Sequence, residues 1–185
     1  MLSLITALVL TQVPDWVEQA RVKAKVEVIS REAQAFCSPE WQQRMHGFEV
    51  LCAAKPKAVT TAHWRAPKKD ESWTVRVDTL QFDKPEQVTA LIAKFRELSG
   101  TNHGTRRADG GFGPTLSWCE TSYVFAGDTA VVVSVACGAE RPWCAVTEQL
   151  LNAAGAGTIA VVGRIGGTAQ IVTEPSAVWR TPRSK

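Results

Sequence analysis

Five cysteines carry the most readily predicted chemistry in this chain, and their spacing favours disulfide bonds. Cys37 follows a predicted helix over residues 14–36, and Cys52 lies near the end of a second predicted helix over 38–54. A helical hairpin would bring the two thiols together, and closing a loop of this length stabilises a fold by about 3 kcal/mol. We therefore expect a Cys37–Cys52 bridge.

The other three cysteines leave the second pairing open. In a predicted hairpin over 117–126 and 130–138, matching the apolar faces places Cys119 opposite Cys137. Cys144, in the first turn of the next helix, could instead pair with Cys137, and one thiol is left over in either case. A helix N-terminus activates a thiol, so an unbridged Cys144 is either a reactive residue or a buried core side chain. No Cys-x-x-Cys pair is present, which argues against a thioredoxin-type oxidoreductase.

Three histidines, His46, His63 and His103, are the side chains that could act as bases at neutral pH. No nucleophile sits in the glycine-flanked turn that presents it to a substrate. His46 and Glu49 fall on one helix face, but a single pair is far short of a metal-ligand set. The sequence therefore predicts no catalytic residue, no metal and no cofactor, and it leans towards a protein that is not an enzyme.

Candidate binding residues come from a glycine-rich stretch and from tryptophan. Residues 100–114 are long enough to form a binding loop, and they contain Arg106 and Arg107. The stretch lies between a helix and a hairpin, so it does not match a phosphate cradle. Seven tryptophans accompany a single tyrosine, and although most should fill the core, large rings also anchor ligands. The candidate exposed rings on the predicted sheet are Trp64, Trp73 and Trp118.

The apolar run Leu2–Leu10 predicts a signal peptide over residues 1–13 and an extracytoplasmic location, periplasmic or secreted. It is too short to cross a bilayer, which needs about 20 apolar residues. We expect no stable membrane span once the signal is removed. No Lys or Arg precedes the run and the cleavage pattern Val9-x-Thr11 is poor, so a buried N-terminal strand or helix start is the alternative.

Composition bounds the remaining possibilities. Residues 14–176 suffice for a single domain with a real core, followed by a frayed basic tail over 177–185. A net charge of +3 is too small and too evenly spread to favour nucleic acid as a partner.

Hairpins and single helices alternate along the chain. Two units each have two predicted strands and a helix: 58–66, 73–82 and 83–98, then 117–126, 130–138 and 140–153. A third hairpin follows at 158–165 and 168–173. Both helices start with acid-base-proline, which indicates either a duplicated ββα unit or simply a common helix entry. This order predicts an α+β fold with an antiparallel sheet built from hairpins and the helices packed on one face.

Alternation predicts which side chains share a face of each hairpin. In the first hairpin Trp64 lies opposite Trp73, which leaves a half-exposed polar face. The polar face carries Thr61, His63, Arg76 and Asp78. In the second hairpin a three-residue loop over 127–129 predicts the opposite pairs Phe125–Val131 and Tyr123–Val133, all on one buried face.

These features predict an exported, disulfide-stabilised domain that binds an unidentified protein or small ligand and catalyses nothing. Two alternatives remain. One is an exported hydrolase whose cysteine or histidine site is assembled in space. The other is a small-ligand carrier with a tryptophan-lined pocket.

Overall fold

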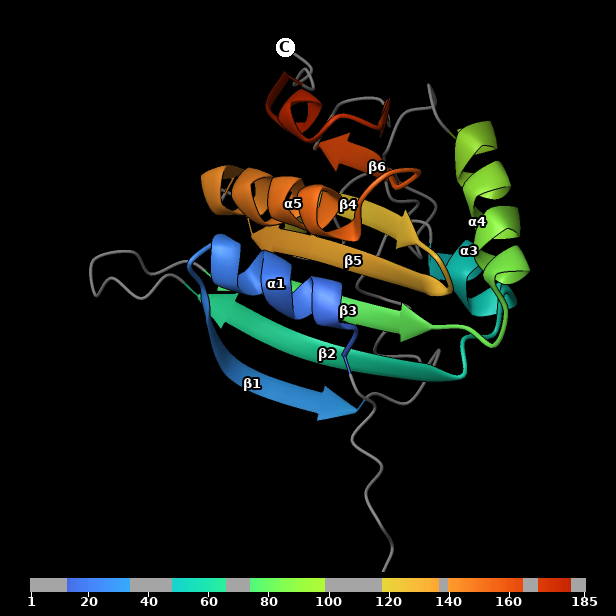
Figure 1. Cartoon of the computed structure of the whole chain (residues 1–185), viewed down its shortest axis with the longest axis horizontal. Helices are drawn as coiled ribbons and strands as arrows, with labels where there is room; N and C mark the ends of the chain where they lie inside the picture. Colours follow the sequence, from blue (N-terminus) through green and yellow to red (C-terminus); the bar gives the residue numbers. More distant parts are fainter. Residues whose placement is uncertain are drawn as a thin grey trace, which may run out of the picture.

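The computed structural model describes residues 13–33, 48–65, 74–98, 118–136, 140–164 and 170–180 (Figure 1). Its strands form a seven-stranded antiparallel sheet in the order β1-β2-β3-β5-β4-β6-β7. The strands are β1 (Glu27–Ala33), β2 (Ala58–Arg65), β3 (Thr74–Gln81), β4 (Trp118–Ala126), β5 (Thr129–Ala136), β6 (Ile159–Arg164) and β7 (Gln170–Val172). The helices are α1 (Asp15–Lys23), α3 (Phe48–Ala53), α4 (Pro85–Leu98), α5 (Glu140–Ala154) and the 3-10 helix η1 (Pro175–Arg180). The predicted α+β class is confirmed.

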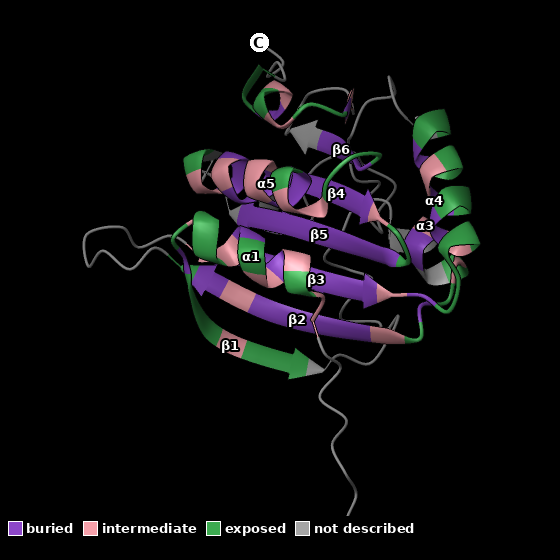
Figure 2. Ribbon diagram, in the orientation of Figure 1, coloured by how far each residue is buried: buried purple, intermediate pink, exposed green. Residues whose placement is uncertain are grey.

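Helices cover both faces of the sheet, so the prediction that they pack on one face is wrong. Helices α1 and α5 pack on one face, which we call the α1/α5 face, against Val131 and Val133 of β5. Helices α3 and α4 pack on the other, the α3/α4 face, against Val132 of the same strand. Successive side chains of a strand point to opposite faces, and β5 is apolar at all of these positions. Such a strand needs cover on both sides, and Figure 2 shows the central strands buried along most of their length.

The first helix is shorter than the pattern suggested, because residues 27–33 form strand β1. Helix α1 ends where Lys25 adopts a left-handed backbone conformation, with φ of 55°. The alternation of apolar residues through Val26 and Val28 therefore indicated a strand correctly, and the helical interpretation was wrong over β1. Glu18 of α1 is bonded to Arg31 of β1, which ties the helix to the strand that follows it.

The first hairpin keeps its predicted faces, whereas the second does not. Trp64 lies opposite Val75, a shift of two residues from the predicted register, and a two-residue shift preserves the faces. In the second hairpin the loop is two residues long, Gly127-Asp128, so Phe125 lies opposite Ala130. That one-residue slip moves Tyr123 and Phe125 to the α3/α4 face, away from the valines with which they were matched. The predicted shared face of the second hairpin is therefore wrong.

The two ββα units differ in where their helices pack. Helix α4 contributes to the core of the α3/α4 face and α5 to the core of the α1/α5 face. A duplication with matching helix positions is thus not confirmed. The predicted frayed tail is wrong as far as Arg180, since η1 forms there and its Val178 is fully buried in the core of the α1/α5 face. The residues beyond it lie outside the described ranges.

Candidate functional site

The side chains on the α3/α4 face change from apolar to polar along the strands. One row crosses five strands and is apolar: Val59, Leu80, Ala130, Phe125 and Ile159. Two residues further along each strand lies a mixed row, and beyond it a polar row: Ser30, His63, Arg76, Ser134 and Thr121. Helix α4 packs its apolar residues against the end of this face that carries the apolar row. The polarity of the strands therefore decides which part of this face a helix can cover.

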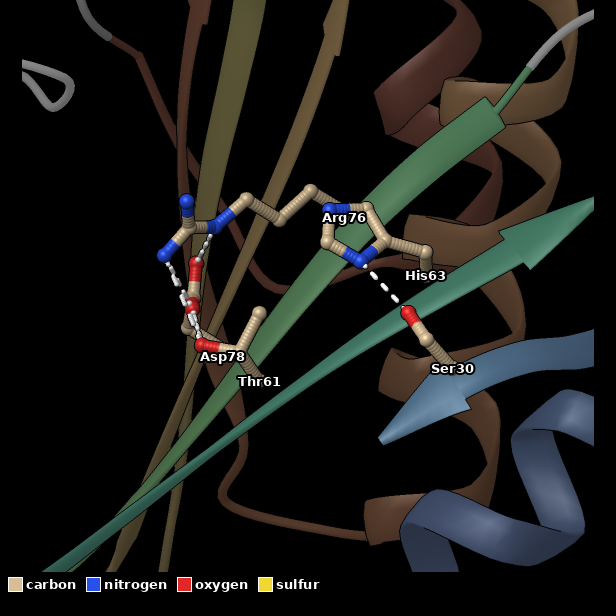
Figure 3. Close-up of polar contacts among 5 residues, drawn as sticks. All are labelled: Ser30, Thr61, His63, Arg76 and Asp78. Carbon is tan, nitrogen blue, oxygen red and sulfur yellow. Dashed lines mark hydrogen bonds and ion pairs between the residues drawn. The ribbon is translucent and has the colours of Figure 1, made fainter. Parts of the chain in front are cut away.

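A buried ion pair lies where the polar row begins (Figure 3). Arg76 donates from Nε to Asp78 Oδ2 and from Nη2 to Asp78 Oδ1, both at 2.8 Å. The Thr61 hydroxyl donates to Oδ1 of the same carboxylate, and the side chains of Arg76 and Asp78 are 6% and 0% exposed. A bidentate pair with an added hydroxyl fixes the geometry of both charged groups, as buried charges require. These residues share a face as the sequence predicted, but they are buried where half exposure was expected.

Ser30 and His63 form the more accessible part of the polar row. The Ser30 Oγ and His63 Nδ1 atoms are 2.9 Å apart, and both residues are partly exposed (Figure 3). A hydroxyl beside an imidazole is part of the machinery of a nucleophilic hydrolase. Within the described ranges no carboxylate is bonded to this imidazole, and no cluster of histidine, cysteine and carboxylate side chains could hold a metal ion. The pair alone therefore does not define a catalytic site.

Two buried hydroxyls on this face are unusual. Among the described residues, neither Tyr123 Oη nor Ser134 Oγ has a hydrogen-bond partner. Burial raises the pKa of Tyr123 above its ordinary value, so the phenol stays protonated. The ring of Tyr123 packs against Phe95 of α4, with centroids 4.5 Å apart. An unsatisfied buried hydroxyl costs about 1–3 kcal/mol, so these two groups do not account for the stability of the sheet.

An apolar groove lies between α3 and α4, two helices that stand side by side in Figure 1. Its volume is about 560 Å³. The described residues that line it are Val50, Ala53, Ala54, Gln87, Ala90, Leu91 and Lys94. Small side chains on both helices leave the space open, while the buried Leu91 joins the groove to the core beneath.

The side chain of Gln87 joins the two walls of the groove. Its Nε2 donates to the Ala54 carbonyl oxygen at the end of α3, at 3.0 Å. Its Oε1 accepts from the Lys84 backbone N–H just before α4, at 3.1 Å. The amide of Gln87 is thus hydrogen-bonded within the protein. Lys94 is the charged residue of the described lining. Lys94 is paired with Glu97 at 3.1 Å on the exposed side of α4.

The structure changes the interpretation of two residues singled out from the sequence. Trp64 is 1% exposed in the core of the α1/α5 face, so its assignment to an exposed binding surface is wrong. Helices on the α1/α5 face cover this side of β2, whereas the binding-surface prediction assumed that the face was open to solvent. Cys144 is buried in the same core, as the non-reactive alternative predicted.

Three other predicted site residues lie on described elements. Cys52 lies in α3, and Trp118 and Cys119 lie in β4, where the register shifts between Trp118 and Glu120. The predictions for Cys37, Trp73, Arg106, Arg107 and Cys137 concern residues outside the described ranges. The disulfide pairings therefore stay predictions.

The groove was missed because most of its described lining residues are aliphatic and match no functional motif. Ala90 of α4 is exposed and looked like an ordinary surface position. The only signal was a run of small residues at the end of the second predicted helix, which includes Ala53 and Ala54. Such a run matters only once a second helix is known to pack beside it.

Comparisons with known proteins do not supply a function. No family model, no curated protein and no solved structure matches this chain. The helices in the described part of the chain are all too short or too polar to cross a membrane.

Proposed function

We propose that the protein is an exported binding domain that holds a small apolar molecule in the groove between α3 and α4. The groove itself is the observation that carries this proposal. Ligand sites in proteins are concave, mostly apolar and about 300–1,000 Å³ in volume. A groove of about 560 Å³ lined by Val50, Leu91 and three alanines fits that description.

The carrier proposed here differs from the one suggested by the tryptophan content. Five of the seven described lining residues are aliphatic, and none of the seven is a tryptophan. The hydrolase alternative has the Ser30–His63 contact in its favour and no further described component. Binding is therefore the better-supported class.

Export is part of the proposal and rests on the apolar run Leu2–Leu10 and on the five cysteines. We expect the mature chain to begin between about residues 10 and 14. N-terminal sequencing of the exported protein tests this, and soluble protein retaining Met1 would contradict it. We also propose the Cys37–Cys52 bridge, which peptide mapping under non-reducing conditions should recover.

Binding to the groove can be tested with N-phenyl-1-naphthylamine, an uncharged probe that fluoresces in apolar surroundings. We expect the full chain to enhance the fluorescence of the probe. The variant Ala90→Trp should abolish the enhancement, because a large ring then fills the groove.

Ala93→Trp is the matched control. Ala93 is also an exposed alanine of α4, and it is not among the residues that line the groove. Both variants should keep the circular dichroism and melting temperature of the parent. Loss of probe binding in both variants, or in neither, would refute the groove as the site.

A further inference from the structure

We propose that the molecule held in the groove is a monomeric anionic amphiphile, with an apolar chain over the alanines and a carboxylate at Lys94. This inference rests on the proposed function and adds the chemistry of the ligand. Charge complementarity is the argument for it. The described lining contains one cation and no acid, and its remaining polar side chain, Gln87, is satisfied within the protein.

The spacing of residues along α4 suits a ligand with one charged end. Gln87, Ala90, Leu91 and Lys94 recur at helical intervals and so lie along one side of the helix. At 1.5 Å per residue, Lys94 lies about 10 Å along the helix axis from Gln87. The wall between them is aliphatic. A chain laid along that wall can place an acidic group at Lys94.

The ion pair between Lys94 and Glu97 does not prevent a ligand carboxylate from binding to Lys94. Lys94 and Glu97 are 63% and 66% exposed, and ion pairs at such exposed positions contribute only about 0.2–1 kcal/mol. The ammonium group also has three N–H donors, so it can bind a ligand carboxylate while it keeps its bond to Glu97. The same weakness limits the selectivity to be expected, because the new ion pair is also close to solvent.

A membrane surface fits the exposed side of α4 less well. Interfacial helices bury large apolar rings and chains and carry an excess of basic residues. The exposed positions of α4 include Ala90 and Ala93, and the acids Glu86 and Glu97 offset its basic residues. Neither acid lines the groove, so the apolar chain of a small molecule lies away from both of them, and only its charged end comes near Glu97.

Displacement of N-phenyl-1-naphthylamine by decanoate and by decanol, both below their aggregation concentrations, tests the inference. We expect decanoate to compete about 1.5- to 5-fold better than decanol, which is the fold-change that an exposed ion pair supplies. The difference should shrink at high salt because the charges are screened.

Three variants assign that preference to Lys94. Lys94→Met keeps the apolar stem and should make decanoate and decanol equal. Glu97→Gln removes the competing acid and should increase the preference for decanoate. Arg96→Met is the matched control, since it removes an exposed cation of α4 that does not line the groove, and it should leave the preference unchanged.

The outcomes separate this inference from the proposed function. Equal displacement by decanoate and decanol in the parent overturns the anionic ligand and leaves the groove proposal standing. Failure of the probe to bind at all refutes both. Binding to phosphatidylglycerol vesicles without competition by monomeric decanoate, or probe binding only in a dimeric fraction, would assign the groove to a bilayer or to a second copy and overturn the inference.

Discussion

Removing the positive partner of the buried ion pair should strongly destabilise the fold. In the variant Arg76→Met, Asp78 keeps its hydroxyl partner Thr61 but loses both bonds from the guanidinium. Because the Asp78 side chain is fully buried, water cannot replace those bonds. Breaking one side of a buried pair costs about 3–5 kcal/mol, which is a large part of the stability of an ordinary domain of about 5–15 kcal/mol.

The double variant Arg76→Met/Asp78→Asn separates the cost of an orphaned charge from the value of the pair. It leaves no charge in the site, and the asparagine oxygen can still accept from Thr61. Since neutral replacements of buried pairs are often tolerated, we expect the double variant to regain most of the lost stability. Urea unfolding followed by tryptophan fluorescence gives both values by linear extrapolation. The reasoning fails if Arg76→Met costs under about 1 kcal/mol, as an exposed pair would, or if the double variant is no more stable than the single one.

Four further predictions concern single positions. Burial disfavours the ionised form of Tyr123, the only tyrosine, and so raises its pKa. The stability of the fold should therefore fall above about pH 10, where only the unfolded chain can lose this proton. Tyrosinate absorbance should appear only as the protein unfolds, and its appearance at pH 10 in folded protein would contradict this. Burial alone would raise the pKa of Glu18, but hydrogen bonds and charges from Arg21 and Arg31 more than offset it, so the pKa is lowered. The ionised carboxylate therefore stabilises the fold above about pH 4.5, and this stability is lost on further acidification. In Glu18→Gln the melting temperature should fall less steeply with decreasing pH than in the parent. Val133→Asp should leave the domain unfolded by circular dichroism, because it buries an unpaired charge at a position with 0% exposure. Ser134→Ala should change the unfolding free energy by less than about 1 kcal/mol or increase it, because the hydroxyl has no described partner; a larger loss would reveal one.

Elements with one clear periodicity were predicted well from the sequence. Helices α4 and α5 start at the acid-base-proline sequences. The strands of the first and third hairpins lie where alternation or an apolar run placed them. Residues 27–33 were misassigned because Val22, Val26 and Val28 fit a helical stripe as well as the alternation of a strand. The helix ends instead at a left-handed backbone conformation at Lys25, which no local sequence pattern predicts.

Registers and faces were harder to predict because both faces of the central strands are apolar. Alternation can fix a register only when one face is polar, since a slip then exposes apolar side chains. In β5 the consecutive apolar run from Ala130 to Val133 buries equally well in either register. In the first hairpin the polar residues of β3 distinguish one face from the other, and the predicted faces are correct there.

The polarity of the α3/α4 face also explains where the groove lies. Phe95 anchors α4 on the apolar end of the sheet through its contacts with Tyr123 and Phe125, at centroid distances of 4.5 and 5.4 Å. The polar row could not accept an apolar helix without burying its charged groups against hydrocarbon. The position of α4, and with it the wall of the groove, therefore follows from the rows of the sheet. Because the groove shares no residue with the Arg76–Asp78 pair, Arg76→Met should lower the stability of the domain without changing the affinity of the folded fraction for the probe.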